Sequence, residues 1–269
     1  MNRSILLSVV SALLLVSCSQ STITPQPGIP VTGNTPPPTA STVTPAAGSA
    51  LTFDGRDDYV MVADDPSLDL QNSFTIAAWI YLDGYREWGS IVTKGDKPNI
   101  NNYAIQQSGP FDPIYKTEYG KLRFSGCASL TAPLPELETL LLLGQWYFVA
   151  VTFDGSQIRF YWNGRFDGAS DVQGPLCTND QPLYIGVDFP LTTEYWYGAI
   201  DELRIWNVTL SESQVQEAMT GLTPLESDLV GYWPFDEGAG SVAHDRSIHA
   251  NDGLLVGDPA WIHPGAPVQ

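Results

Sequence analysis

The stretch Tyr197–Trp206 combines a carboxylate with the residue pattern of a buried strand. Asp201 has the same parity along the chain as Leu203 and Ile205, so we expect all three side chains to point to one face of a sheet. If that face is the core, a carboxylate lies in or near the interior. A buried charge is tolerated only beside a cation or several hydrogen-bond donors. Asp201 is therefore the first candidate for a chemical role.

Short strands are expected around Asp201. Residues 74–82 are apolar on both parities, which is typical of a central strand covered on both faces. Residues 147–169 contain three strand-like segments separated by Asp154-Gly155 and Asn163-Gly164, which supply the positive φ of tight hairpin turns. This stretch predicts a three-stranded meander.

Two further strands are predicted at 181–186 and 195–206, and one helix at 211–219. Ser211 is expected to cap the helix, with Gln214 as its reciprocal partner. The predicted fold class is all-β, a two-sheet antiparallel sandwich with one short helix.

Four stretches in order resemble the laminin G-like jelly-roll domains of the concanavalin A-like lectin/glucanase superfamily; they are residues 51–60, 74–82, 145–155 and 197–206. The resemblance spans about residues 51–218 and implies a jelly-roll sandwich over 50–222. It implies no particular ligand, because this fold carries lectins, adhesion modules and glycan-active enzymes. Residues 223–269 also resemble a segment of the family, one that commonly precedes the first strand. They either fold back to complete the same sandwich, which we expect, or begin a truncated second module.

The resemblance also implies a structural calcium ion that joins Asp201 to the turn Asp54-Gly55. Carboxylate and backbone carbonyl oxygens are the ligands that Ca²⁺ requires. The alternative is that Asp201 accepts hydrogen bonds from the backbone of a neighbouring turn, without an ion.

No arrangement of residues in the sequence predicts catalysis. Glucanases of this fold carry alternating acids on one strand, but Glu136 and Glu138 lack a third member. Asp201 and Glu202 are adjacent and are expected to point to opposite faces. The three histidines lie in the last part of the chain and form no zinc motif. The chain is therefore predicted not to be an enzyme.

Aromatic residues in expected loops are candidates for stacking on sugar rings: Tyr85, Trp88, Tyr115, Tyr119, Tyr195 and Trp196. The alternative for each is packing in the core or at its rim. The net charge of −18 argues against nucleic acid as a partner. The leading hypothesis is a non-catalytic cell-surface module that binds a glycan or glycoconjugate. The alternative is a protein-interaction or structural module of the cell envelope.

The first 49 residues predict export. Residues 1–17 resemble a signal peptide that ends in a bacterial lipobox, which makes Cys18 the expected lipidation site and sole membrane attachment. Residues 18–49 are rich in Pro, Thr and Ser, as in a disordered tether. Cys127 and Cys177 are expected to form a disulfide, since exported proteins commonly pair their cysteines. The chain is thus expected to be a lipoprotein facing the periplasm or the cell exterior.

Overall fold

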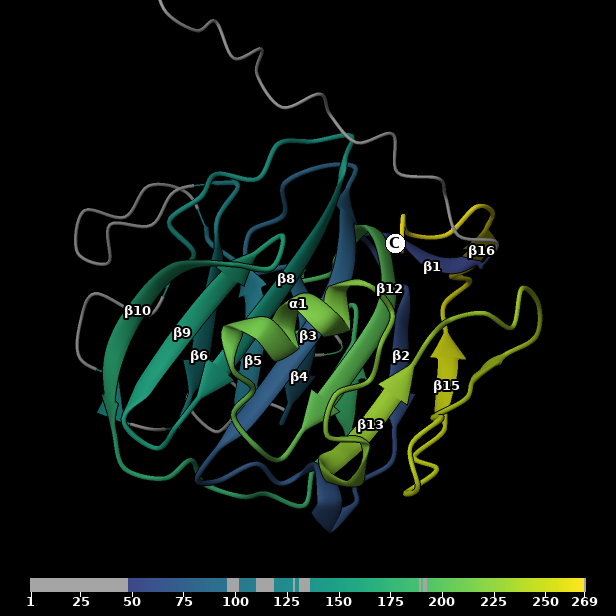
Figure 1. The fold of residues 1–269 in the computed structure, drawn as a ribbon. Helices are drawn as coiled ribbons and strands as arrows, with labels where there is room; N and C mark the ends of the chain where they lie inside the picture. Colours follow the sequence, from purple (N-terminus) through teal and green to yellow (C-terminus); the bar gives the residue numbers. More distant parts are fainter. Residues whose placement is uncertain are drawn as a thin grey trace, which may run out of the picture. The chain divides into compact units, whose positions relative to one another are not determined.

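The computed structural model describes residues 48–95, 102–109, 119–127, 129–130, 136–188, 190 and 193–268. Within these ranges two antiparallel sheets pack face to face, and one α-helix lies on the outer face of the larger sheet (Figure 1). The predicted all-β sandwich with one short helix is confirmed. The signal peptide, Cys18 and the tether as far as residue 47 lie outside the described residues.

The larger sheet contains nine strands among the described residues. Their order is β16 (Ala260–Ile262), β1 (Ala50–Asp54), β12 (Tyr197–Trp206), β3 (Phe74–Leu82), β8 (Trp146–Phe153), β9 (Gln157–Trp162), β10 (Arg165–Gln173) and β7 (Ser129–Leu130), with β13 (Leu229–Trp233) also paired to β12. The predicted meander is β8–β9–β10, and Asn163 and Gly164 take positive φ in its second turn.

The smaller sheet contains seven strands within the same described ranges. Their order is β14 (Val242–Ala243), β15 (Gly253–Val256), β2 (Tyr59–Val62), β11 (Leu183–Ile185), β4 (Ser90–Lys94), β5 (Tyr103–Gln107) and β6 (Leu122–Gly126). Short 3-10 helices occupy Pro66–Leu68 (η1) and Glu226–Asp228 (η2).

Strand β3 is buried on both faces because a different apolar cluster packs against each face. Phe74, Ile76 and Ile80 belong to the main core, together with apolar residues of the smaller sheet. Ala77 and Trp79 belong to a second cluster that includes apolar residues of helix α1 (Glu212–Met219). Figure 1 shows α1 lying across β3 and β8. The helix begins at the predicted capping box of Ser211 and Gln214.

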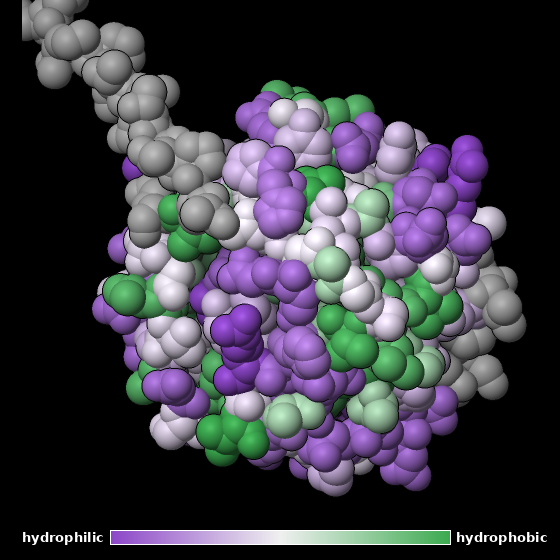
Figure 2. All heavy atoms as spheres, turned by 90° about the vertical axis from the view of Figure 1, so that its right-hand side faces the viewer, coloured by the Kyte–Doolittle hydropathy of each residue, from purple (hydrophilic) through white to green (hydrophobic). Residues whose placement is uncertain are grey.

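The C-terminal segment contributes strands to both sheets. β13 pairs with β12, β16 with β1, and β15 with β2. Trp233 and Phe235 of this segment are fully buried in the main core. Figure 2 faces the side of the molecule on which Figure 1 shows β15 and β16, and on that surface hydrophilic residues are interspersed with hydrophobic ones. The segment therefore buries Trp233 and Phe235 in the core, while Ile248 and Leu254 stay exposed, at 80% and 52%.

The predicted disulfide between Cys127 and Cys177 is present, and it joins the end of β6 to the segment before β11. Disulfides of this kind persist in oxidising compartments, which indicates a location outside the cytoplasm. Within the described ranges, none of the helices has the length and apolar character needed to cross a membrane.

Candidate functional site

A β-bulge in β12 determines where Asp201 points. Asp201 pairs with Trp79 of β3, and the next paired residue of β12 is Arg204, so β12 holds one residue more than β3 at this point. Paired residues of adjacent strands share a face, and Trp79 lies in the cluster on the outer face of the larger sheet. The prediction that Asp201 shares the inner face with Leu203 and Ile205 is therefore wrong. Asp201 is buried as expected, at 3% exposure, but beneath the C-terminal segment.

Glu202 follows in the bulge with φ of +54°, which only a few per cent of non-glycine residues adopt. Its carboxylate lines the same pocket as that of Asp201, so the two adjacent acids do not point to opposite faces. Arg204 Nη2 and Tyr232 Oη donate to Glu202 Oε2, the latter over 3.0 Å. The Arg204 guanidinium also stacks on the Tyr232 ring, 4.1 Å from its centroid. The Arg204 guanidinium beside the bulge is therefore paired with Glu202.

Asp201 itself is bound by backbone donors. Its Oδ1 accepts from Glu202 N over 2.8 Å, and its Oδ2 accepts from Ala266 N over 2.7 Å. Burial, together with the charges of Glu202 and Asp236, raises the pKa of Asp201 to about 8 even though these two N–H groups oppose the shift. Burial also raises the pKa of Glu202. The ionised form of Asp201 thus lacks a countercharge.

These acids line a cavity of about 210 Å³ between the bulge and the two ends of the described chain. Its lining residues are Gly48, Asp201, Glu202, Gly221, Tyr232, Asp236, Ala266 and Val268. Two glycines keep the backbone close to the carboxylates: a Cβ on Gly48 would lie 2.5 Å from Asp236 Oδ1, and one on Gly265 would lie 2.6 Å from Asp201 Oδ2. Three carboxylates thus line one cavity, but among the described residues the carboxylate oxygens gathered closely enough to share a cation are not these.

The structure does not bring Asp54 and Gly55 to Asp201. Asp54 pairs with Tyr197, four residues before Asp201 in β12, which corresponds to about 13 Å along a strand. A calcium ion joining Asp201 to this turn therefore does not fit. Carboxylate oxygens of Asp54, Asp57 and Asp58 instead lie within 4.8 Å of one another, so this acidic triad could hold a metal ion.

Asp58 is only 5% exposed. It accepts hydrogen bonds from the backbone of Asp54 and Asp258, at 2.9 and 2.7 Å. Its carboxylate therefore ties the turn after β1 to the turn after β15. Burial raises its pKa.

Three of the expected sugar-binding aromatics, Tyr85, Trp88 and Tyr119, take part in contacts around the loop between β3 and β4. Tyr85 and Trp88 lie in the loop between β3 and β4, and both are half-buried. Tyr85 stacks on Tyr119, with ring centroids 6.3 Å apart and planes inclined by 26°. The Arg123 guanidinium lies 4.3 Å from the centroid of the Trp88 ring. Arg86 lies between Tyr85 and Trp88 in the sequence. We call the set of five residues the rim: Tyr85, Arg86, Trp88, Tyr119 and Arg123.

Backbone and side-chain contacts hold the rim rings in place. Tyr85 Oη donates to Leu141 O over 2.8 Å, so this ring forms a fixed backing for Tyr119, which is 42% exposed. Trp88 has φ of +59°. A left-handed backbone at a bulky residue costs on the order of 1–3 kcal/mol and is found mainly where surrounding structure or function demands it.

The other expected aromatics do not join the rim. Trp196 is fully buried in the main core, so the expectation that it contacts a sugar is wrong. Tyr195 is 6% exposed and packs with Tyr59 and Tyr184. Tyr115 lies outside the described residues. Trp196 lies just before β12, where its N donates to Gly186 O over 2.8 Å, and the sequence did not show that this position faces the core.

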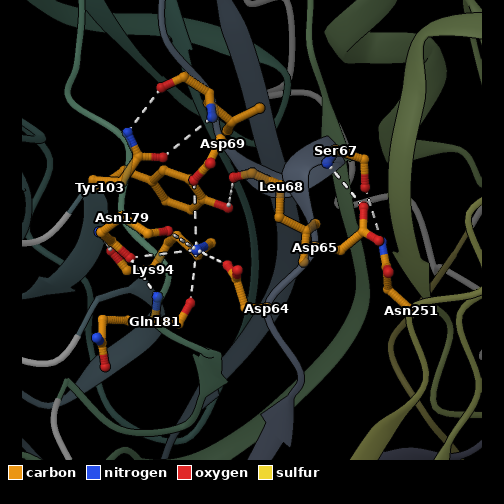
Figure 3. Close-up of polar contacts among 12 residues, drawn as sticks. Asp64, Asp65, Ser67, Leu68, Asp69, Lys94, Tyr103, Asn179, Gln181 and Asn251 are labelled. Atoms are coloured by element: carbon orange, nitrogen blue, oxygen red, sulfur yellow. Dashed lines mark hydrogen bonds and ion pairs between the residues drawn. The ribbon is translucent and has the colours of Figure 1, made fainter.

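Lys94 forms a buried polar cluster on the smaller sheet, at the end of β4 (Figure 3). Its Nζ lies 2.6 Å from Asp64 Oδ1 and 3.5 Å from Asp69 Oδ1, and it donates to the carbonyl oxygens of Asn179 and Gln181. Because every donor of this ammonium group faces a protein oxygen, we interpret the cluster as structural.

Similarity to solved structures agrees with this architecture. A candidate carbohydrate-binding protein from Bacteroides ovatus has a TM-score of 0.67 and 22% identity, over 83% of this chain and 62% of that one. Domain 4 of AbnA, a GH43 extracellular arabinanase from Geobacillus stearothermophilus in complex with arabinotriose, has a TM-score of 0.47 and 20% identity, over 63% of this chain and 75% of that one. The present chain thus spans less than two thirds of the Bacteroides ovatus chain.

Sequence comparison assigns the family. No curated protein matches the chain. Residues 54–216, more than half of the chain, match the laminin G model described as the concanavalin A-like lectin/glucanases superfamily. This range includes the bulged strand β12, the rim and the disulfide. The chain belongs to the concanavalin A-like lectin/glucanases superfamily.

Proposed function

We propose that this protein is a non-catalytic recognition module that binds carbohydrate at the rim. The observation that carries the proposal is the gathering of Tyr85, Trp88 and Tyr119 at one edge, each held by a stacking partner. Held rings lose little conformational entropy when a ligand stacks on them. The rim offers rings and guanidinium groups rather than the pair of carboxylates that glycoside hydrolysis requires.

A glycan array followed by calorimetry tests this proposal. We expect Trp88→Ala and Tyr119→Ala each to weaken binding of the best glycan about tenfold or more. Phe166→Ala is the matched control, because Phe166 is 52% exposed and packs on Tyr161 away from the rim residues. Binding to no glycan, together with capture of one protein partner that sugars do not displace, would favour the protein-interaction alternative instead. Turnover of the bound polysaccharide would contradict the non-catalytic assignment.

A structural calcium ion is part of the proposal, held by the acidic triad Asp54, Asp57 and Asp58. Its support is that one carboxylate oxygen of each of these residues lies within 4.8 Å of the others. The ion would strengthen the link between the turn after β1 and the turn after β15, which Asp58 already joins by hydrogen bonds. A melting temperature that rises with calcium in the wild type and not in Asp57→Asn would support this site, and equal melting temperatures with and without calcium would remove the ion from the proposal.

We further propose that the protein is an exported bacterial lipoprotein anchored through Cys18, with residues 18–49 as a tether. The disulfide supports an oxidising location. Labelling with a radioactive fatty acid should mark the wild type and leave Cys18→Ala unlabelled. Equal labelling of both would remove the anchor from the proposal.

A further inference from the structure

Three of the four leucines at positions 140–143, in the loop before β8, are exposed to solvent. The exposed fractions of Leu140, Leu142 and Leu143 are 44%, 51% and 45%, whereas Leu141 is fully buried in the main core. In the part of the chain that the structure describes, Leu142 and Leu143 are the one pair of sequence neighbours whose large apolar side chains are both exposed. Clustered exposed apolar residues are a solubility liability, and in native proteins they mark an interaction site. We call Leu140, Leu142 and Leu143 the leucine patch.

The leucine patch is continuous with the rim. A Cβ on Gly120 would lie 2.9 Å from Leu140 Cδ1 and 3.2 Å from Tyr85 Cε1, so this leucine and the Tyr85 ring are neighbours. Tyr119, the exposed ring of the rim, is the residue before Gly120. Gly120 O also accepts from Leu141 N over 2.6 Å, which fixes the leucine loop beside Tyr119. A ligand that stacks on Tyr119 therefore has the leucine patch next to it.

Hydrogen bonds hold the loop of the leucine patch in place from both sides. Thr139 N donates to Asp167 Oδ2 over 2.8 Å, just before the leucines. Leu142 N, within the patch, donates to Tyr147 Oη over 3.0 Å. The exposed leucines are therefore presented to solvent by a fixed backbone, and a ligand that covers them pays little for ordering the loop.

Size and charge select the occupant of the leucine patch. Its three side chains expose on the order of 300 Å² of surface, less than half of the ~800 Å² per partner that a stable protein interface buries. The net charge of −18 opposes the close approach of a second copy and of an anionic membrane surface. The hydroxyl groups of a plain sugar do not match leucine side chains. An acyl chain is apolar, uncharged and narrow enough to lie along three leucines.

We propose that the leucine patch binds the acyl chain of a glycolipid whose sugar stacks on the rim. This inference rests on the proposed function and specifies the class of its ligand. The rim holds the sugar, and the leucine patch covers the part of the chain nearest to it. Chain length therefore adds to affinity only as far as the three leucines extend.

Calorimetry with the methyl and octyl glycosides of the sugar that binds best on the array tests the proposal, because the two probes differ only in chain length. The octyl glycoside is used below the concentration at which it forms micelles. We expect the wild type to bind it at least tenfold more tightly than the methyl glycoside, since covering a methylene from one side strengthens binding roughly twofold. Leu142→Ser/Leu143→Ser should lose most of this preference. Leu225→Ser/Leu254→Ser, at leucines of the C-terminal segment exposed to 43% and 52%, is the matched control and should keep it.

The outcomes separate this inference from the proposed function. Equal binding of the two probes by the wild type, or an undiminished preference in Leu142→Ser/Leu143→Ser, overturns the acyl site while glycan binding stands. Flotation with sugar-free phosphatidylcholine vesicles, or dimerisation in sedimentation, that this variant abolishes also overturns it, in favour of a membrane or a second copy. Binding to no glycan of any class overturns both proposals. Melting temperatures exclude a loss of folding, and Leu142→Ser alone serves if the double variant is destabilised.

Discussion

At the scale of single residues, the burial of Asp201 makes the stability of the fold depend on pH. Its pKa is raised to about 8, so without a cation the folded state binds a proton that the unfolded state releases near pH 4. Stability is therefore highest below the unfolded pKa and is lost as the pH rises through 8. We predict that, in chelator, the free energy of unfolding falls by several kcal/mol between pH 4 and pH 8. Asp201→Asn should remove most of this dependence, because it takes away the group that titrates. Urea titrations at several pH values measure it, and an equal slope in wild type and variant would contradict it.

At the scale of elements, the disulfide fixes the end of β6 against the segment before β11. The two cysteines are 50 residues apart, and closing such a loop removes chain entropy worth about 4 kcal/mol from the unfolded state in the loop model. The double variant Cys127→Ser/Cys177→Ser should lose about this much free energy of unfolding in urea. A reductant should destabilise the wild type similarly and leave the double variant unaffected. A wild type insensitive to reductant in its unfolding midpoint would show that the bond does not form in solution.

At the scale of the whole molecule, the C-terminal segment covers edges of both sheets. Deleting residues 224–269 removes β13, β15 and β16 and so exposes β12, β2 and β1. Fully buried side chains such as Trp233 would also leave the main core. We predict that the shortened chain loses its cooperative thermal unfolding, measured by circular dichroism and calorimetry. Removal of residues 1–43, which lie before the first strand, is the control and should leave the melt unchanged. A melt that survives the C-terminal deletion would make this segment an appendage of the sandwich.

The elements were predictable because their signals are local. The apolar run of β3, the turn Asn163-Gly164 and the capping box of Ser211 each depend on residues within a few positions of one another. The fold class was therefore correct from the sequence. The disulfide was correct for another reason, since Cys127 and Cys177 are the two cysteines that remain beside Cys18 in a chain expected to be exported. The direction of the Asp201 side chain was not predicted correctly. One extra residue in β12 reverses the side-chain parity, and such a bulge exists only relative to the neighbouring strand, here β3.

The sequence by itself determined the strand content, the helix cap, the pairing of the cysteines and a buried aspartate in β12. Only the tertiary structure decided which groups meet: Asp236 and Tyr232 with Asp201 in one pocket, Tyr119 with Tyr85 at the rim, and the leucine patch with the rim. It also separated Asp54 from Asp201 and placed Trp196 in the core. The physical reason is that strand propensity acts over neighbouring residues, whereas a binding site depends on sheet pairing and burial between residues far apart in the chain.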